Sequence, residues 1–189
     1  SDLSVMQNPE HTVATERIFR GRIVGLRVDT VQLPGGRVSQ REIVEHSGSV
    51  AVVPLDVHSN ILMVRQYRKP VEQELLEIPA GLLEPGEEPE AAARRELQEE
   101  TGYTAQRIEP LVQFFTSPGF CDEEMHTFLA TGLVAGRPNP DEDEQIKLVP
   151  VPLADVPEMI RRGEIRDGKS IAALLLAVQM DISDDPAVL

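Results

Sequence analysis

The chain has 189 residues and 41% hydrophobic residues, an ordinary share for a globular protein. Its 32 acidic and 18 basic residues give a net charge of −14, which argues against non-specific binding to nucleic acids or anionic membranes. Phosphate substrates are not excluded, because bound cations and local arginines set the field within a site. The single cysteine, Cys121, allows no intrachain disulfide and suits a reducing cytosol.

No basic segment followed by an apolar one marks a targeting signal, and the longest apolar run, residues 171–178, is too short to span a bilayer. We therefore expect a soluble, cytoplasmic protein with neither nucleic acid nor membrane as partner. The four histidines lack metal-ligand spacing, and nothing around Cys121 predicts a nucleophile.

Residues 16–45 have a period of two, which predicts two or three antiparallel strands. Val24, Leu26 and Val28 alternate with polar or small residues, and a Pro-Gly-Gly turn at 34–36 precedes a second alternating run. So small a sheet cannot bury its own apolar face. We expect residues 1–46 to form an N-terminal β domain that lies on the main domain or on a second subunit.

Residues 47–189 are expected to form the main domain. Near-continuous apolar runs predict covered strands at 50–55 and 61–64, and further strands are expected at 74–79, 111–115, 127–131 and 146–151. Helical spacing occurs at 153–162 and 170–180. Because strands and helices alternate irregularly, the order favours a mixed sheet between helices over a doubly wound parallel sheet.

One more helix is predicted from Pro89, a residue suited to the first helical turn, to Gly102, suited to a left-handed cap. Glu96, Glu99 and Glu100 share one face of this helix, where like charges repel by roughly 0.2–0.5 kcal/mol per pair. A divalent cation would reverse that repulsion, because Mg²⁺ prefers oxygen ligands. The alternative is a solvated acidic face.

The spacing around this helix resembles the Nudix box at every position. Gly81, five residues, Glu87 and seven residues are followed by Arg95-Glu96-Leu97-x-Glu99-Glu100-x-Gly102-Tyr103. The resemblance implies an α/β/α sandwich that hydrolyses a nucleoside diphosphate linked to another moiety. It implies Mg²⁺ as cofactor, with Mn²⁺ or Zn²⁺ able to substitute.

By the same resemblance, four positions are expected to hold metal: Ala80, through its carbonyl, and Glu96, Glu99 and Glu100. Glu99 is also counted among the catalytic residues. Glu87 is expected to pair with Arg95 and to brace the loop.

Three features resemble the ADP-ribose pyrophosphatase branch of this family. Pro118 lies 16 residues after Gly102, an Arg-Glu-Ile-Val-Glu-His stretch begins at Arg41, and an acidic loop contains Glu142 and Glu144. The alternative for Pro118 is an ordinary turn, and the alternative for the acidic loop is a solvated loop without a catalytic role. The resemblance implies a homodimer and a nucleotide-sugar substrate, ADP-ribose, cleaved to AMP and ribose 5-phosphate.

Within that assignment, Glu142 is the expected general base, with Glu144 as the second candidate. Arg41 and Arg68 are expected to bind phosphate or the terminal ribose, because a guanidinium matches phosphate oxygens, although both could be surface charges. Pro118 and Phe120 are expected near the substrate. The aromatic residue that stacks on adenine stays open among Phe19, Tyr67 and Phe120.

Two alternatives remain. The first is a pyrophosphatase for another nucleoside diphosphate sugar, such as GDP-mannose. The second is a non-catalytic nucleotide sensor, which the complete box and the lack of a basic segment disfavour.

Overall fold

The computed structural model describes residues 10–137 and 146–180. These residues form two compact units, one containing the described residues up to Ser47 together with Phe115–Glu123, the other containing Gly48–Phe114 and the described residues from Glu124 onward. No helix of the described residues is long and apolar enough to cross a membrane.

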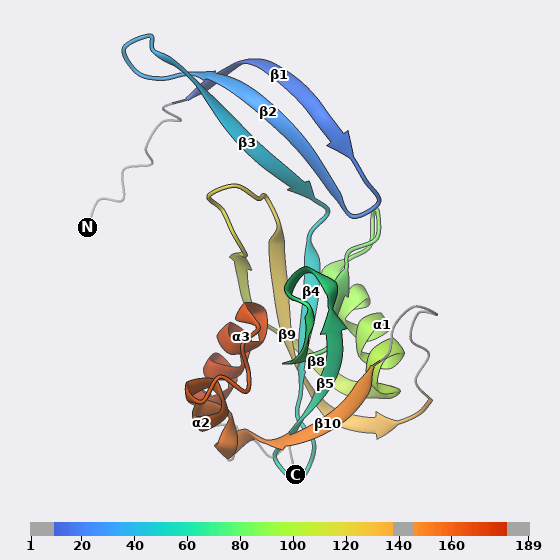
Figure 1. Ribbon diagram of the computed structural model, residues 1–189. Helices are drawn as coiled ribbons and strands as arrows, with labels where there is room; N and C mark the ends of the chain where they lie inside the picture. The colour runs from blue at the N-terminus through green and yellow to red at the C-terminus, as the bar shows by residue number, and fades with distance from the viewer. Residues whose placement is uncertain (1–9, 138–145, 181–189) are drawn as a thin grey trace, which may run out of the picture. The chain divides into compact units, whose positions relative to one another are not determined.

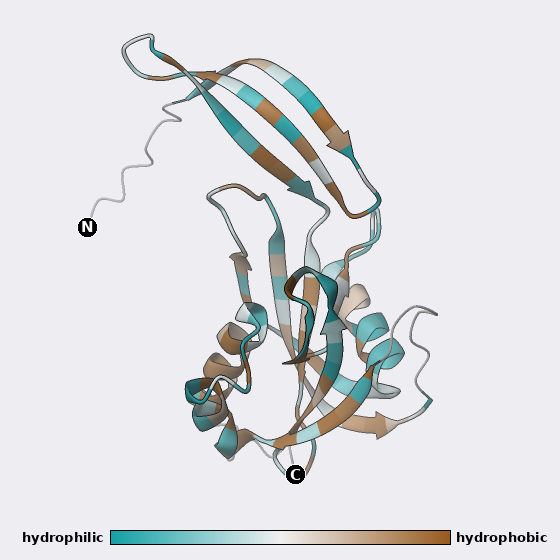
Figure 2. Ribbon diagram, in the orientation of Figure 1, coloured by the Kyte–Doolittle hydropathy of each residue, from teal (hydrophilic) through white to brown (hydrophobic). Residues whose placement is uncertain are grey.

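The first unit is a three-stranded antiparallel sheet in the order β1-β2-β3 (Figure 1). Its strands are β1 (His11–Arg20), β2 (Val24–Gln32) and β3 (Val38–His46). Hydrophilic and hydrophobic residues alternate along β2 (Figure 2), which is the period of two that predicted it, whereas in β3 it is the exposure that alternates from Val38 to Ile43. Every residue of β1 is exposed, so neither face of this strand is distinguished from the other by burial.

The segment Phe115–Glu123 belongs to this first unit and forms hydrogen bonds with the end of β3. The Val44 N–H donates to the Phe120 carbonyl at 2.7 Å, and the His46 N–H donates to the Asp122 carboxylate at 2.8 Å. Cys121 also forms an isolated parallel bridge with Val44. Residues more than 70 positions apart in sequence are thereby held side by side.

The second unit contains two further sheets. One has the antiparallel order β10-β5-β6, and the other has the order β7-β4-β9-β8, in which β4 pairs parallel with β9 and antiparallel with β7. The strands are β4 (Ser49–Pro54), β5 (Asn60–Arg68), β6 (Gln73–Glu77), β7 (Ala80–Leu82), β8 (Tyr103–Phe115), β9 (Glu124–Ala135) and β10 (Lys147–Pro152).

The helices of this unit are α1 (Pro89–Thr101), α2 (Val156–Arg161) and α3 (Gly168–Gln179), with short 3₁₀ turns η1 (Lys69–Val71) and η2 (Leu153–Asp155). In Figure 1, α1 lies on the opposite side of β4 and β9 from α2 and α3. The predicted α/β/α sandwich with a mixed sheet, accompanied by an antiparallel N-terminal sheet, is confirmed.

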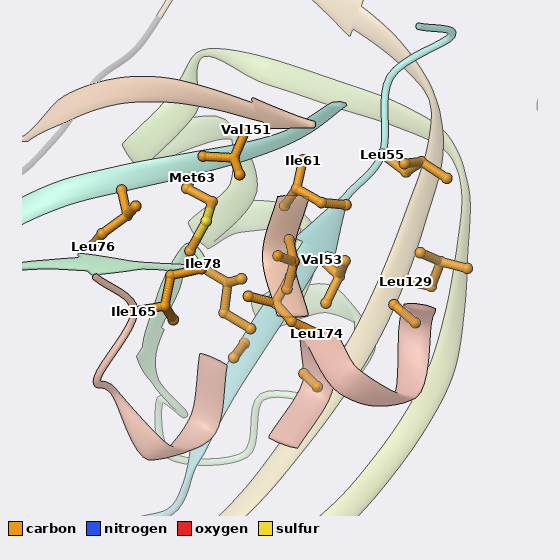
Figure 3. Close-up of a cluster of buried hydrophobic side chains, with 14 of the residues drawn as sticks. Val53, Leu55, Ile61, Met63, Leu76, Ile78, Leu129, Val151, Ile165 and Leu174 are labelled. Carbon is orange, nitrogen blue, oxygen red and sulfur yellow. The ribbon is translucent and has the colours of Figure 1, made fainter. Parts of the chain in front are cut away.

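Strand β4 shows why the unit has three layers. Its residues are all buried, and they alternate between two apolar clusters. Val50 and Val52 join the cluster that contains Leu97 of α1, whereas Ala51 and Val53 join the one that contains Leu174 of α3. Figure 3 shows Val53, Ile61, Ile78 and Leu174 directed toward one another. A strand covered on both faces reads as a continuous apolar run, as the sequence does here.

Candidate active site

Helix α1 begins and ends where the sequence predicts. Glu88 is the extended N-cap, Pro89 opens the first turn, and Gly102 is the left-handed C-cap with φ of 76°. The Gly102 N–H closes the helix on the Gln98 carbonyl at 2.8 Å. A residue with a Cβ is disfavoured in this conformation, so glycine terminates the helix and releases the chain directly into β8.

Glu96 lies directly over Gly81. Strand β7 pairs with β4, placing Gly81 opposite Val50, and α1 packs its Glu96 carboxylate against the glycine backbone. A Cβ on residue 81 would overlap that carboxylate. A larger residue here would therefore have to displace the Glu96 carboxylate, which is buried.

Glu100 lies one turn further along the same face and is also buried. Its Oε2 accepts the Ala80 N–H at 3.2 Å. This contact fixes the start of β7 to α1, so that Ala80, Gly81, Glu96 and Glu100 lie together.

The Arg95 guanidinium forms hydrogen bonds with three acidic side chains. Its Nε and Nη2 donate to Glu87 at 3.0 and 2.9 Å, and Nη1 donates to Glu96 at 2.6 Å and to Glu99 at 3.0 Å. Nη2 also donates to the Leu82 carbonyl at 3.0 Å. These hydrogen bonds, foremost those with Glu87, raise the pKa of Arg95, and the Arg95 bond lowers the pKa of Glu87. The predicted pairing of Glu87 with Arg95 is present.

The donor set suits a hard divalent cation, since Glu96, Glu99 and Glu100 offer the carboxylate oxygens that such an ion prefers. Within residues 10–137 and 146–180, however, no three acidic, histidine or cysteine side chains converge closely enough to hold a metal ion. The reason is visible in the hydrogen bonds: Glu96 and Glu99 are both turned toward the Arg95 guanidinium. In this arrangement Arg95 supplies the positive charge that the acidic face needs.

Arg68, the last residue of β5, lies beside this group, and its guanidinium is held by Glu77 through two bonds of 2.8 Å. The Glu77 hydrogen bond raises the pKa of Arg68, and the nearby charge of Glu100 adds to that effect. Lys169 is a second cationic partner of Glu77 at 2.5 Å. Sequence reasoning missed Glu77 and Lys169, although a lone acid within the apolar run Leu75-Leu76-Glu77-Ile78 was a usable signal.

The other expected substrate residues lie in the first unit. Arg41 of β3 donates from Nη2 and Nε to the Glu10 carboxylate at 2.5 and 3.1 Å. Pro118 and Phe120 lie in the Phe115–Glu123 segment, and the Phe120 side chain is exposed. The structure thus groups the predicted residues in two sets, one per unit. Glu142 and Glu144 lie outside the described residues.

Two family models match the chain. The NUDIX domain model matches residues 45–174, and the model of the nucleoside diphosphate sugar hydrolase N-terminal domain matches residues 10–44.

Curated relatives cover most of the chain. An ADP-ribose pyrophosphatase of Bacillus subtilis (strain 168) is 47% identical over 87% of this chain and 90% of its own length. A methanol dehydrogenase activator of Bacillus methanolicus is 48% identical over the same shares, 87% and 90%. A GDP-mannose pyrophosphatase of Escherichia coli O1:K1 / APEC is 32% identical over 71% and 75%.

A solved structure described as an ADP compounds hydrolase superposes with a TM-score of 0.80 at 25% identity, covering 89% of this chain and 91% of its own. The fold, the complete box around α1 and these matches lead to one conclusion: this chain belongs to the Nudix hydrolase family.

Proposed function

We propose that this Nudix hydrolase cleaves the pyrophosphate bond of ADP-ribose and releases AMP and ribose 5-phosphate. The observation that carries the proposal is the acidic face of α1, complete in its residues and fixed against Gly81 and Ala80 of β7. The substrate assignment is supported by the 47% identity with an ADP-ribose pyrophosphatase along nearly the whole chain.

Nudix hydrolases generally use divalent cations, and we propose Mg²⁺ here, with Mn²⁺ or Zn²⁺ able to substitute. Glu96, Glu99, Glu100 and the Ala80 carbonyl would hold the metal. When bound, such ions neutralise the pyrophosphate and lower the pKa of the attacking water. Glu96 lies against Gly81 and Glu100 accepts the Ala80 N–H, so both carboxylates are held at the start of β7.

The remaining roles follow from side-chain chemistry. Glu142 removes the proton of the attacking water, with Glu144 as the second candidate, a contribution of about 10²–10⁴-fold. Arg68 and Arg41 bind anionic oxygens of the substrate through their guanidinium groups. Pro118 and Phe120 contribute to the substrate site from the Phe115–Glu123 segment.

We further propose that residues 1–46 are an N-terminal domain, residues 47–189 the hydrolase domain, and the protein a cytoplasmic homodimer. The two family models, which meet between residues 44 and 45, support the division. The exposed apolar side chains of β1, among them Val13, Ile18 and Phe19, support a covering partner subunit. Sedimentation that gives a fully active monomer would contradict the dimer.

A phosphate-release assay coupled to a phosphatase tests the function with ADP-ribose, GDP-mannose, NADH and a nucleoside triphosphate. We expect cleavage of ADP-ribose with the highest kcat/KM, abolished by EDTA. Glu96→Gln should lower that value on the order of several hundredfold with the fold intact, because a carboxylate that holds the metal is lost. Near-normal turnover of this variant would contradict the site.

Two other functions have support in the relatives. Faster cleavage of GDP-mannose would assign the chain to the activity named for the 32% identical relative. The 48% identical relative is named as an activator of methanol dehydrogenase, which favours a regulatory role as the second candidate. Addition of the chain to a methanol dehydrogenase assay, with Glu96→Gln alongside, separates activation that needs hydrolysis from activation by binding alone.

A further inference from the structure

A buried carboxylate lies between two cations at the end of β6. The Glu77 side chain is 2% exposed, and its oxygens accept from Arg68 Nε and Nη2 at 2.8 Å and from Lys169 Nζ at 2.5 Å. Burial alone would raise the Glu77 pKa, but the bonds and charges of Arg68 and Lys169 lower it to about 2. Glu77 is therefore an ionised, fully engaged acceptor at neutral pH.

The start of α3 anchors this carboxylate from behind. Asp167 is the N-cap of α3, accepting the Ser170 N–H at 3.0 Å, and it also accepts a bond from Lys169 at 2.9 Å. Ser170 is fully buried, and its hydroxyl accepts the N–H of Ile78, the residue after Glu77, at 2.9 Å. Two adjacent α3 residues thus hold two adjacent residues at the end of β6.

These contacts set the orientation of the Arg68 guanidinium. The Nε and Nη2 edge is occupied by Glu77, while Nη1 has no hydrogen-bond partner among the described residues. The side chain is 37% exposed, and its charge acts on Glu100 of the acidic face. One edge of the guanidinium is therefore held by Glu77, and the Nη1 edge remains available.

Lys169 also sets the charge balance. Glu77 by itself would cancel the charge of Arg68, but Lys169 shares the same carboxylate. Asp167, which partners Lys169, is in turn stabilised by its place at the positive end of the α3 dipole. The two cations and the two carboxylates balance in charge, so Arg68 attracts an anion through the Nη1 edge that Glu77 does not occupy. Stability alone is a weak reason for such a cluster, since apolar residues often replace buried ion pairs without loss.

We propose that Glu77 and Lys169 are positioning residues of the hydrolase: they hold Arg68 so that its free Nη1 edge binds an anionic phosphate oxygen of the substrate. The identity of that substrate rests on the proposed function. Neither residue touches the substrate, and both act through Arg68.

A double-mutant cycle on ADP-ribose hydrolysis tests this. Lys169→Met, which keeps Arg68 and Glu77 but removes the second anchor of the Glu77 carboxylate, should lower kcat/KM about tenfold, and Arg68→Met should lower it on the order of a hundredfold. The double variant should match Arg68→Met alone, because Lys169 acts through a group that is already absent. Losses that multiply in the double variant would overturn the proposal. Lys169→Arg should restore most of the activity.

A second measurement does not depend on turnover. In ¹⁵N spectra, the Arg68 Nε–H should exchange slowly with solvent in the wild-type protein and at least about tenfold faster in Lys169→Met, since opening of its pair with Glu77 exposes it. Unchanged exchange would refute the positioning role. If the wild-type protein fails to cleave ADP-ribose while this exchange pattern is observed, the proposed function is wrong and the orientation of Arg68 stands.

Discussion

Replacement of Gly81 by alanine tests the site at its tightest point. The added Cβ would overlap the Glu96 carboxylate, which is buried and hydrogen-bonded to Arg95. The Glu96 carboxylate is the end of a flexible side chain, but moving it disrupts its hydrogen bond with Arg95, while Gly81 is paired to Val50 in the sheet and α1 is packed on β4 through Leu97. The carboxylate must therefore move, or β7 must separate from α1.

The expected magnitudes follow from that overlap. Forcing an extra methyl group into a packed site costs about 1–3 kcal/mol of folding free energy. Displacing Glu96 on the order of 1 Å from its working position should lower kcat/KM on the order of a hundredfold. The loss of activity should exceed what the loss of stability explains, because the variant remains folded at 25 °C.

Gly168→Ala is the matched control. Gly168 opens α3, its φ lies outside the left-handed region, and a Cβ there meets nothing within 4 Å. This variant should be as stable as the wild-type protein or more stable by about 0.5–1 kcal/mol, since alanine is the better helix former.

Urea denaturation and kcat/KM for ADP-ribose are measured on both variants, with and without Mg²⁺. Wild-type protein and Gly168→Ala should gain stability from Mg²⁺ through ligand linkage, and Gly81→Ala should gain less. If Gly81→Ala matched Gly168→Ala in stability, activity and response to Mg²⁺, the close approach of Glu96 to Gly81 would have no functional role.

Three further predictions concern charge and packing. The Glu77 pKa of about 2 lies below its ordinary value, so this group adds stability above pH 4.5 that is lost as pH falls toward 2. In urea titrations from pH 7 to pH 2, wild-type protein should lose up to about 3 kcal/mol more than Glu77→Gln, and parallel losses would contradict the pairing. Arg95→Lys removes the guanidinium that Glu87, Glu96 and Glu99 share, and it should lower the free energy of unfolding by about 2–3 kcal/mol. Arg94→Lys on the exposed face should lower it by less than about 1 kcal/mol. Equal costs of the two lysine substitutions would show that the Arg95 contacts are unimportant. Leu174→Ala in the filled core should cost about 2–5 kcal/mol by denaturation with kcat unchanged, and the neighbouring, exposed Leu175→Ala should cost far less.

Local pattern predicted much of the fold. The apolar run of β4, the alternation of β2 and both ends of α1 were readable because each depends on neighbours within a few residues. Strand β8 was only partly predicted: the sequence indicated 111–115, and the structure has Tyr103–Phe115. Its first half is largely polar or exposed, so pairing within the sheet, and not burial, makes it a strand.

The sequence by itself determined the chemistry of α1. The helical period places Glu96, Glu99 and Glu100 on one face, and Gly102 ends the helix, whatever the rest of the chain does. Tertiary packing decided what surrounds that face. Glu96 of α1 contacts Gly81 of β7, and Arg95 is shared among three carboxylates. Lys169 binds Glu77, which lies 92 positions earlier in the sequence. Hydrogen bonds and ion pairs act over a few ångströms of space, so such partners are fixed only when the strands and helices have packed.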